Sequence, residues 1–325
     1  MQLSDMFLTI QEDLKHVEVV LDHSLHSKLP LVPEVSRYVI NNGGKRLRPA
    51  LFLLCARVAG VASHRDLAKI GASLEMIHTA SLLHDDVVDD ALLRRGKPST
   101  KAKWGNQVSV LVGDFLWCRG CGILVECDDI KLLDVVTKAI VAVTEGVLLE
   151  LSRQNDMNID QEAYFEMIRG KTAALFGACG ECAGIVAGLS EQYVTALKRY
   201  CFDLGMAFQL ADDALDYISQ DKGFGKKVGG DLREGRLTYP LILALKQADE
   251  SELQTIREAL ISDHLGDAQF QNVLSIIQRY DGVEETFKLA RDFAEKAKAH
   301  LKLFKPSIER EALIKATDYA VERRI

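Results

Sequence analysis

"LLHDDVVDDALLRRG", residues 82–96, places four aspartates within six positions, directly after an apolar run that includes Met76, Ile77, Leu82 and Leu83. A carboxylate beside a hydrophobic core is costly unless a partner replaces its lost hydration. These aspartates therefore either face water or bind a strongly positive group, and the fold must provide for one of the two.

A second aspartate cluster repeats the spacing of the first. The segment "GMAFQLADDALDYIS", residues 205–219, is again apolar and again carries the pattern DDxxD. On a helix, residues four apart share a face, so two such helices facing one another would surround a cavity with carboxylates. One DDxxD is more often a solvated acidic face, whereas two copies, each followed by basic residues, favour a metal site. The candidate metal ligands are Asp85, Asp86, Asp89, Asp212, Asp213 and Asp216.

Magnesium bound together with a diphosphate suits such a cavity. Mg2+ prefers octahedral oxygen ligands, keeps several waters, and binds through one or two carboxylates plus substrate phosphates. Two carboxylate walls can hold a cluster of about three ions, and the diphosphate supplies further oxygens. The sequence therefore predicts Mg2+ as the cofactor.

Basic residues near both clusters outline sites for two diphosphates, one on the metals and one on arginine and lysine alone. Arginine stays charged and can bind phosphate oxygens through two nitrogens. Each basic residue alone is more often a solvated surface charge. Arg94 and Arg95 should follow the first cluster after about one more helical turn. The candidate diphosphate ligands are Lys45, Arg48, Arg94, Arg95, Lys226, Lys227 and Arg236.

The rest of the chain predicts one all-α domain over residues 1–325. No proline falls between Pro98 and Pro240, and this stretch is rich in Ala, Leu and Glu, which is typical of stacked helices. An amphipathic helix is expected from Leu3 to Leu21, and residues 139–151 should form a helix buried at the centre. Residues 221–240 carry five glycines and many charges, so we expect a long flexible loop there, such as a lid.

Composition excludes several classes of protein. A net charge of -7 argues against nucleic-acid binding, the N-terminus does not resemble a signal peptide, and residues 172–189, the most apolar candidate, are too rich in Ala and Gly for a membrane span. Seven cysteines, an odd number, indicate reduced thiols and a cytoplasmic location. Two CxxC pairs leave a zinc site open, but cysteines one helical turn apart are usually small core residues.

The ordered motifs GGKRLRP, LLHDDVVDDALLRRGKPS, GDFL, KTAALF, FQLADDALDY and GKKVGGDLREGRLTYPLI resemble those of the trans-polyprenyl diphosphate synthases, in particular long-chain members of the octaprenyl type. The resemblance spans about Asn41 to Leu243. It implies an isoprenoid-synthase helical bundle around a central cavity, a homodimer, and Mg2+-dependent prenyl transfer. A long product, as the residues before Asp85 indicate below, would suit the side chain of a quinone.

The resemblance also implies a role for each matching residue. An allylic diphosphate, farnesyl or geranylgeranyl, would bind through Mg2+ and lose its diphosphate with help from Arg94, Lys171 and a loop lysine. Its carbocation would be held near Lys171, Thr172 and Gln209. Isopentenyl diphosphate would bind at Lys45, Arg48, His78 and Arg95, attack the cation, and lose a proton to the departing diphosphate. The glycine-rich segment and residues 319–325, "YAVERRI", are candidates for closing the site.

Two positions indicate the product length. Ala80 and Ser81 lie one helical turn before Asp85, where short-chain members of the family resemble one another in placing aromatic rings as a floor. Small residues there predict a long product, unless the floor is built elsewhere, for example by residues 115–124.

Three other functions stay open. A terpene cyclase would share the ionisation step but would not need Lys45, Arg48 and Arg95, and a non-catalytic partner subunit would be expected to lose aspartates. A di-iron bundle would use the ExxH spacing of Glu75 and His78, but it needs a second ExxH that this sequence lacks. Relatives often have lysine in place of Arg236, and the doubled Lys226–Lys227 leaves open which lysine reaches the diphosphate.

Overall fold

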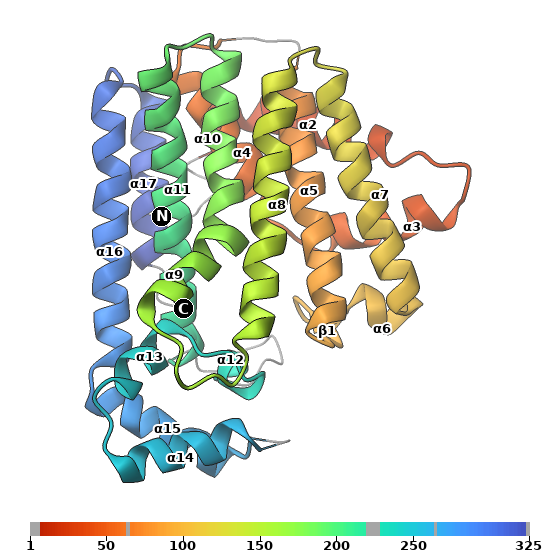
Figure 1. The fold of residues 1–325 in the computed structure, drawn as a ribbon. Helices are drawn as coiled ribbons and strands as arrows, with labels where there is room; N and C mark the ends of the chain where they lie inside the picture. Colours follow the sequence, from red (N-terminus) through yellow and green to blue (C-terminus); the bar gives the residue numbers. More distant parts are fainter. Residues whose placement is uncertain (1–6, 63–65, 219–227, 263–264, 323–325) are drawn as a thin grey trace. The chain divides into compact units, whose positions relative to one another are not determined.

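The computed structural model describes residues 7–62, 66–218, 228–262 and 265–322 and confirms the all-α prediction (Figure 1). Its contacts divide the chain into two compact units. Unit 1 comprises Met1–Ile140, Leu175–Cys201 and Ala299–Ala316, and unit 2 comprises Val141–Ala174, Phe202–Lys298 and Thr317–Ile325. A single domain over residues 1–325 stays a prediction.

Helices follow one another along nearly the whole described chain. The helix expected from Leu3 to Leu21 is confirmed from Gln11 onward as α2, after a short 3-10 turn η1 (Leu8–Ile10), and the first residues of the expected helix lie outside the described residues. The first half of the chain contains α2 (Gln11–Ser24), α3 (Leu31–Asn41), α4 (Leu47–Val58), α5 (Leu67–Val88), β1 (Leu93–Arg94), β2 (Lys97–Pro98), α6 (Thr100–Trp104), α7 (Asn106–Val125) and α8 (Ile130–Ser152). The second half contains α9 (Gln161–Ile168), the π-helical turn η2 (Arg169–Ala173), α10 (Ala174–Val186), α11 (Glu191–Asp216), α12 (Gly230–Arg233), α13 (Tyr239–Leu245), α14 (Glu250–Leu260), α15 (Asp267–Arg279), α16 (Gly282–His300), the 3-10 turn η3 (Leu301–Leu303) and α17 (Ile308–Glu322).

The core of unit 1 is built on α4 and α5. Residues 49–56 of α4 are all buried, and α5 packs along α2, α4 and α7. Trp117 of α7 donates its indole N–H to the carbonyl of Ile77 on α5 at 3.2 Å, which ties the two helices together. This packing fixes the direction of α5, and the first aspartate cluster lies at its end.

A β-hairpin replaces the helical turn that the sequence predicted after the first aspartate cluster. α5 ends at Val88, and β1 pairs with β2 in antiparallel register, Arg94 opposite Lys97. The two residues of the turn, Arg95 and Gly96, have φ of 52° and 75°, the left-handed backbone that a tight two-residue hairpin requires. The prediction was wrong because it extended the helical period past a turn.

α8 is not the fully buried helix that its apolar sequence predicted. Val141, Leu148 and Leu151, all in unit 2, are 55%, 59% and 43% exposed. An apolar run has the same pattern whether its helix is covered by the same chain or faces outward, so sequence alone could not separate the two cases.

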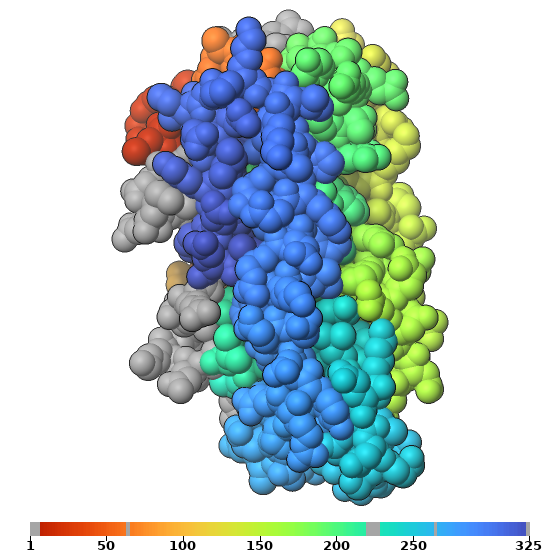
Figure 2. Space-filling view, turned by 90° about the vertical axis from the view of Figure 1, so that its left-hand side faces the viewer, coloured from red at the N-terminus to blue at the C-terminus, as the bar shows by residue number. Residues whose placement is uncertain are grey.

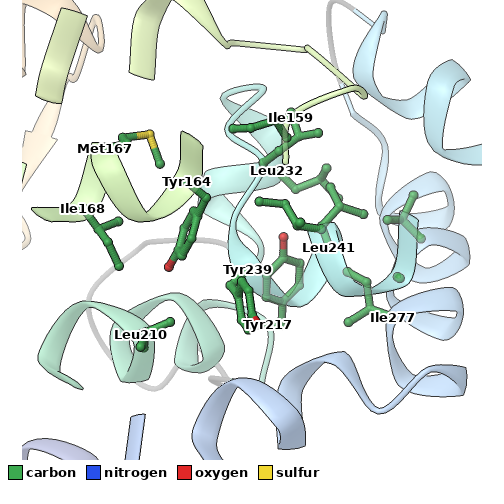
Figure 3. Close-up of a cluster of buried hydrophobic side chains, with 14 of the residues drawn as sticks. Ile159, Tyr164, Met167, Ile168, Leu210, Tyr217, Leu232, Tyr239, Leu241 and Ile277 are labelled. Carbon is green, nitrogen blue, oxygen red and sulfur yellow. The ribbon is translucent and has the colours of Figure 1, made fainter. Parts of the chain in front are cut away.

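The core of unit 2 lies beneath the second aspartate cluster. Figure 3 shows Tyr164, Tyr217 and Tyr239 among aliphatic side chains, and the rings of Tyr164 and Tyr239 stack at 5.5 Å. α16 runs along the face that Figure 2 shows. Its buried residues are small and include Ala290, Ala294 and Ala297, and small side chains let a neighbouring helix approach closely.

The described cysteines are all free thiols, with different surroundings. Cys179 and Cys182 are buried on α10, as expected of small core residues, but Cys118 on α7 is exposed and Cys121 is partly exposed. α7 is also the one described helix long and apolar enough to cross a membrane, a test that core helices pass as well.

Gly180 of α10 is expected to be intolerant of any side chain. A Cβ there would overlap the carbonyl oxygen of Leu197 on α11 and lie 3.0 Å from the Sγ of Cys201. Alanine normally stabilises a helix relative to glycine, but here the overlap should reverse the sign. We expect Gly180→Ala to lower the free energy of unfolding by about 1–3 kcal/mol, seen as a lower urea midpoint.

Gly122 of α7 provides the matched control. A Cβ there would meet nothing within 4 Å in the same chain. In dilute samples without contact between copies, Gly122→Ala should leave the free energy of unfolding unchanged or raise it by the helix-propensity gain of about 1 kcal/mol. An unchanged midpoint for Gly180→Ala would contradict the close helix contact.

Candidate functional site

The first aspartate cluster lies at the C-terminal end of α5, in unit 1. Asp86 is buried, and the Nε of Arg94 donates to its Oδ1 at 2.5 Å. Burial raises the pKa of Asp86, and Arg94 opposes that rise. Asp85 and Asp89 keep partial exposure, and the N–H of Asp89 donates to the carbonyl of Asp85 at 2.8 Å. Asp86 is therefore committed to the hairpin, while the other two carboxylates are accessible from solvent.

Two tight turns place basic residues of unit 1 beside one another. Arg46, at the start of α4, has φ of 48°, and Arg95 occupies the hairpin turn. A Cβ on Gly44 would lie 3.0 Å from an Nη1 of Arg46 and 3.3 Å from that of Arg95. Gly44 is thus closely packed against two guanidinium groups, and a larger residue there would have to displace one of them.

Arg46 and Arg48 differ in what they contact. Arg46 donates to Glu18 at 2.5 Å, to the carbonyl of Ile40 at 3.1 Å and to Glu75 at 3.2 Å. Arg48 instead lies over the ring of Phe176, 4.9 Å from its centroid. Its Nε is buried and has no hydrogen-bond acceptor within the described residues. A buried donor without an acceptor is costly, and a bound anion would satisfy it.

His78 belongs to the same basic cluster. Burial and the charges of Arg48, Arg95, Arg94 and Arg46 hold its pKa well below the usual value. Its imidazole is therefore neutral and can donate one N–H to an anion. Lys45 is exposed on the loop before α4. Unit 1 thus holds Arg48, His78 and Arg95, three of the residues that the resemblance assigns to isopentenyl diphosphate, beside Arg94, which it assigns to the allylic diphosphate.

Two hydrogen bonds tie the hairpin to the segment that leads into the Gly-Gly turn. The hydroxyl of Tyr38 donates to the carbonyl of Pro98 at 2.8 Å, and the Nζ of Lys97 donates to Asn42 at 3.2 Å. These contacts fix the separation between the two turns, and hence between Arg95 and the start of α4.

The second aspartate cluster lies at the C-terminal end of α11, in unit 2. Asp213 is buried and accepts from Tyr164 at 2.5 Å and from Gln209 at 2.7 Å. Burial and the charge of Asp231 raise its pKa well above the usual value, against these two hydrogen bonds. Asp212 is exposed. Asp212 and Asp213 therefore have different surroundings, although they are adjacent in the chain.

Asp216 shapes the start of α12. Its two carboxylate oxygens accept the backbone N–H groups of Gly230 and Asp231 at 3.1 and 3.0 Å. This capping turns part of the expected flexible loop, residues 228–238, into ordered chain with one helical turn, a difference that the glycine content did not predict. Arg236 pairs with Asp231 and Glu234. Lys226 and Lys227 lie outside the described residues, as do residues 323–325.

Lys171 and Thr172 lie on the π-helical turn between α9 and α10. Such turns occur often at functional sites. Gly146 and Gly170 allow it here, because a Cβ on Gly170 would lie 2.5 Å from the carbonyl oxygen of Ala142 on α8. The Nζ of Lys171 contacts Glu150.

A chain of hydrogen bonds links this turn to α11. The hydroxyl of Thr172 donates to Gln209 at 2.7 Å, and the amide nitrogen of Gln209 donates to Asp213. The oxygen of Gln209 is thereby aimed at the π-helical turn. Unit 2 thus assembles Lys171, Thr172 and Gln209, the three residues expected to stabilise a cation.

The two chain-length candidates on α5 have different exposure. Ala80 is fully buried, whereas Ser81 is partly exposed and donates its hydroxyl to the carbonyl of His78 at 2.8 Å. A side chain lengthened at Ser81 therefore has access to open space, and one lengthened at Ala80 does not.

Sequence reasoning did not assign three residues that hold these groups in place. Glu75, Glu150 and Tyr164 contact Arg46, Lys171 and Asp213, respectively. The sequence pattern marked Glu75 only through its ExxH spacing with His78. Tyr164 lies seven residues before Lys171, which is about two turns of a regular α-helix. The π-helical turn interrupts that regular spacing, so helical periodicity alone could not relate the two residues.

No three His, Cys, Asp or Glu side chains within the described ranges converge as a ready-made metal site. Mg2+ requires no such cage, because it takes one or two carboxylates and completes its shell with water and phosphate. The accessible carboxylates of Asp85, Asp89 and Asp212 fit that requirement, since oxygen is the ligand that Mg2+ prefers.

Comparison with known proteins gives a consistent result. The family model described as polyprenyl synthetase matches residues 29–277. The all-trans-nonaprenyl-diphosphate synthase (geranyl-diphosphate specific) of Rhodobacter capsulatus is 37% identical over 98% of this chain and 97% of that protein. The octaprenyl diphosphate synthase of Escherichia coli K12 is 38% identical over 96% of both. A crystal structure of a polyprenyl synthase from Caulobacter crescentus CB15, complexed with calcium and isoprenyl diphosphate, has a TM-score of 0.94 and 39% identity over 100% of this chain and 98% of that one.

Proposed function

Because this chain belongs to the polyprenyl synthetase family and has the isoprenoid-synthase fold of its structural relatives, we propose that it is a Mg2+-dependent trans-polyprenyl diphosphate synthase of the long-chain type. It condenses farnesyl or geranylgeranyl diphosphate with successive isopentenyl diphosphates, and the all-trans product serves as a quinone side chain. The related long-chain synthases support the product class. Residues 1–325 act as one catalytic domain, located in the cytoplasm.

The buried Nε of Arg48 is the observation that carries the two-substrate reaction. It points to an anion that binds without help from the aspartates, beside His78 and Arg95. A cyclase, which has one diphosphate substrate, does not need this second anion site. We assign the site, together with Lys45, to isopentenyl diphosphate.

The aspartates divide between holding Mg2+ and holding the protein. Asp85, Asp89 and Asp212 are the proposed ligands, because they are accessible. Asp86, Asp213 and Asp216 support them through Arg94, Tyr164 and the start of α12. When held by these carboxylates, Mg2+ would neutralise charge on the diphosphate of the allylic substrate and so make it a better leaving group. A calcium ion in the related polyprenyl synthase supports a divalent cation here.

The residues of the π-helical turn act on the organic part of the substrate. The oxygens of Thr172 and Gln209 provide fixed dipoles that stabilise an allylic cation, and Lys171 helps hold the departing diphosphate. Either Lys226 or Lys227, together with Arg94 and Arg236, adds positive charge near that diphosphate. The departing diphosphate takes the proton from the condensed product, so no protein base is needed.

One assay tests this function directly. Labelled isopentenyl diphosphate is incubated with farnesyl diphosphate, with and without Mg2+, and the extracted product is separated by length. We expect a Mg2+-dependent ladder that ends at one long chain. Release of diphosphate from the primer without elongation would indicate a cyclase, and the absence of both reactions would contradict an enzymatic role.

We also propose that the active form is a homodimer that packs through α7. Leu111, Cys118 and Val125 recur at seven-residue steps on its exposed side, and Leu111 and Val125 are 66% and 63% exposed. A seven-residue apolar stripe is the pattern by which one helix packs against another, and a contiguous exposed stripe marks an interaction surface.

Leu111→Glu is expected to convert the dimer into a monomer at micromolar concentration, because it places a charge within an apolar stripe that the partner would bury. Light scattering coupled to size-exclusion chromatography measures the mass. Ile308→Glu on α17, where Ile308 is 72% exposed in the same unit, is the matched control and should stay dimeric. A dimeric Leu111→Glu protein would place the interface elsewhere.

A further inference from the structure

Glu75 is a buried carboxylate within the basic cluster of unit 1, and the proposed mechanism gives it no role. Its side chain is 6% exposed and lies 3.2 Å from Arg46. A Cβ on Gly44 would lie 3.6 Å from its Oε1 and 3.0 and 3.3 Å from the nearest nitrogens of Arg46 and Arg95, so the carboxylate and both guanidinium groups converge on the same backbone position. A negative charge at the edge of an anion site needs an explanation, because it repels the ligand.

Glu75 is not required to hold Arg46 in place. Glu18 of α2 accepts from both the Nε and an Nη of Arg46, at 2.5 and 3.3 Å, and the carbonyl of Ile40 accepts at 3.1 Å. A glutamine at position 75 could still accept from the Nη1 of Arg46. The feature of Glu75 that a neutral side chain cannot replace is therefore its charge.

Every element packed around Glu75 contributes at least one ionisable group. α2 contributes Glu18, α4 contributes Arg46 and Arg48, the hairpin contributes Arg95, and α5 itself contributes the neutral His78. Burial raises the pKa of Glu75, and Arg46 and Arg48 oppose that rise. Cations outnumber anions around Glu75. The cluster therefore still attracts an anion, but less strongly than its arginines alone would.

The chemistry of elongation gives this weakening a purpose. The allylic substrate loses its diphosphate, whereas the diphosphate of isopentenyl diphosphate stays on the lengthened product. We call the proposed isopentenyl diphosphate site, at Lys45, Arg48, His78 and Arg95, the arginine site. In every cycle the lengthened product must leave this site before the next isopentenyl diphosphate can bind. A site built only of cations would bind the diphosphate tightly and slow each transfer.

We propose that Glu75 is a positioning residue that sets the affinity of the arginine site, balancing the cations when the site is empty and opposing the diphosphate when it is filled. The inference rests on the proposed function, because it assumes that this site binds a diphosphate. It predicts that removing the charge tightens binding, whereas a merely structural role predicts that binding weakens.

The test measures binding of inorganic diphosphate by calorimetry in the presence of a metal chelator, which isolates the arginine site from the Mg2+ sites. We expect Glu75→Gln to bind about tenfold more tightly than the wild type, the scale of one partly screened charge in the protein interior. With Mg2+, its steady-state elongation rate should fall while its KM for isopentenyl diphosphate also falls. Glu18→Gln is the matched control: it has the same partner, Arg46, but is about half exposed, and its affinity should stay near that of the wild type.

Three outcomes separate the possibilities. Weaker or unchanged diphosphate binding by a folded Glu75→Gln protein overturns the inference. If that variant does not fold, as judged by circular dichroism, Glu75→Met supplies a second neutral side chain of similar size, and the same comparison decides. If the wild type elongates but its affinity matches that of both neutral variants, only the inference fails, and if the wild type neither elongates nor binds diphosphate, the proposed function fails first.

Discussion

Replacing Asp85 with asparagine is expected to lower the rate of chain elongation by about a thousandfold or more, the scale on which losing one group that binds a catalytic ion or a developing charge acts. Asp85 is accessible at the end of α5, whereas Asp86 beside it is already committed to Arg94. Asparagine keeps the size of the side chain but loses the charge that attracts Mg2+. The loss should therefore appear mainly in the rate and in the Mg2+ concentration required.

Steady-state kinetics over a range of Mg2+ concentrations measure both effects. Asp90→Asn is the matched control, because the Asp90 side chain is 90% exposed and pairs with Lys101. Asp90 also has φ of 50°, a backbone that asparagine tolerates, so this variant should keep nearly full activity. A full elongation rate for Asp85→Asn at limiting Mg2+ would contradict its role as a ligand.

The helical part of the fold could be predicted from sequence because it depends on local rules. A long proline-free stretch and regular apolar spacing identify helices, and the structure confirms them. The hairpin at Arg95–Gly96, the π-helical turn at Lys171 and the ordered turn after Gly229 each depend on contacts or backbone angles that no periodic pattern encodes. The exposed side of α8 depends on which of its residues other helices cover, and that is set by contacts between distant parts of the chain.

The site shows the same division between pattern and contact. The aspartates stand out because their spacing puts several carboxylates on one helix face, and the arginines stand out because they cluster. Sequence could not indicate that Tyr164 donates to Asp213, or that Arg46 donates to Glu18, Ile40 and Glu75. Nor could it indicate that the buried Nε of Arg48 has no acceptor among the described residues. Those differences come from residues far apart in the chain, and they separate side chains of one type into different tasks.

Product length should respond most strongly to a change at Ser81. We expect Ser81→Phe to shorten the product by several isoprene units, because one added ring can block a narrow apolar channel. Ser81 lies one turn before Asp85 and is partly exposed, so an added ring can enter the space that the growing chain would occupy. The ring blocks extension without touching the aspartates. The first condensations should therefore proceed at nearly the normal rate, and chromatography of the labelled products should show a ladder that stops early.

Ser81→Ala is the matched control, because it removes the hydroxyl that donates to the carbonyl of His78 without adding bulk, and its product length should equal that of the wild type. Ala80→Phe separates blocking from overpacking. Ala80 is fully buried, so a ring there should cost about 1–3 kcal/mol of stability and lower the yield of folded protein rather than set a new length. If Ser81→Phe makes the wild-type product at the wild-type rate, the growing chain does not pass this turn of α5, and the floor that limits it is built by other residues.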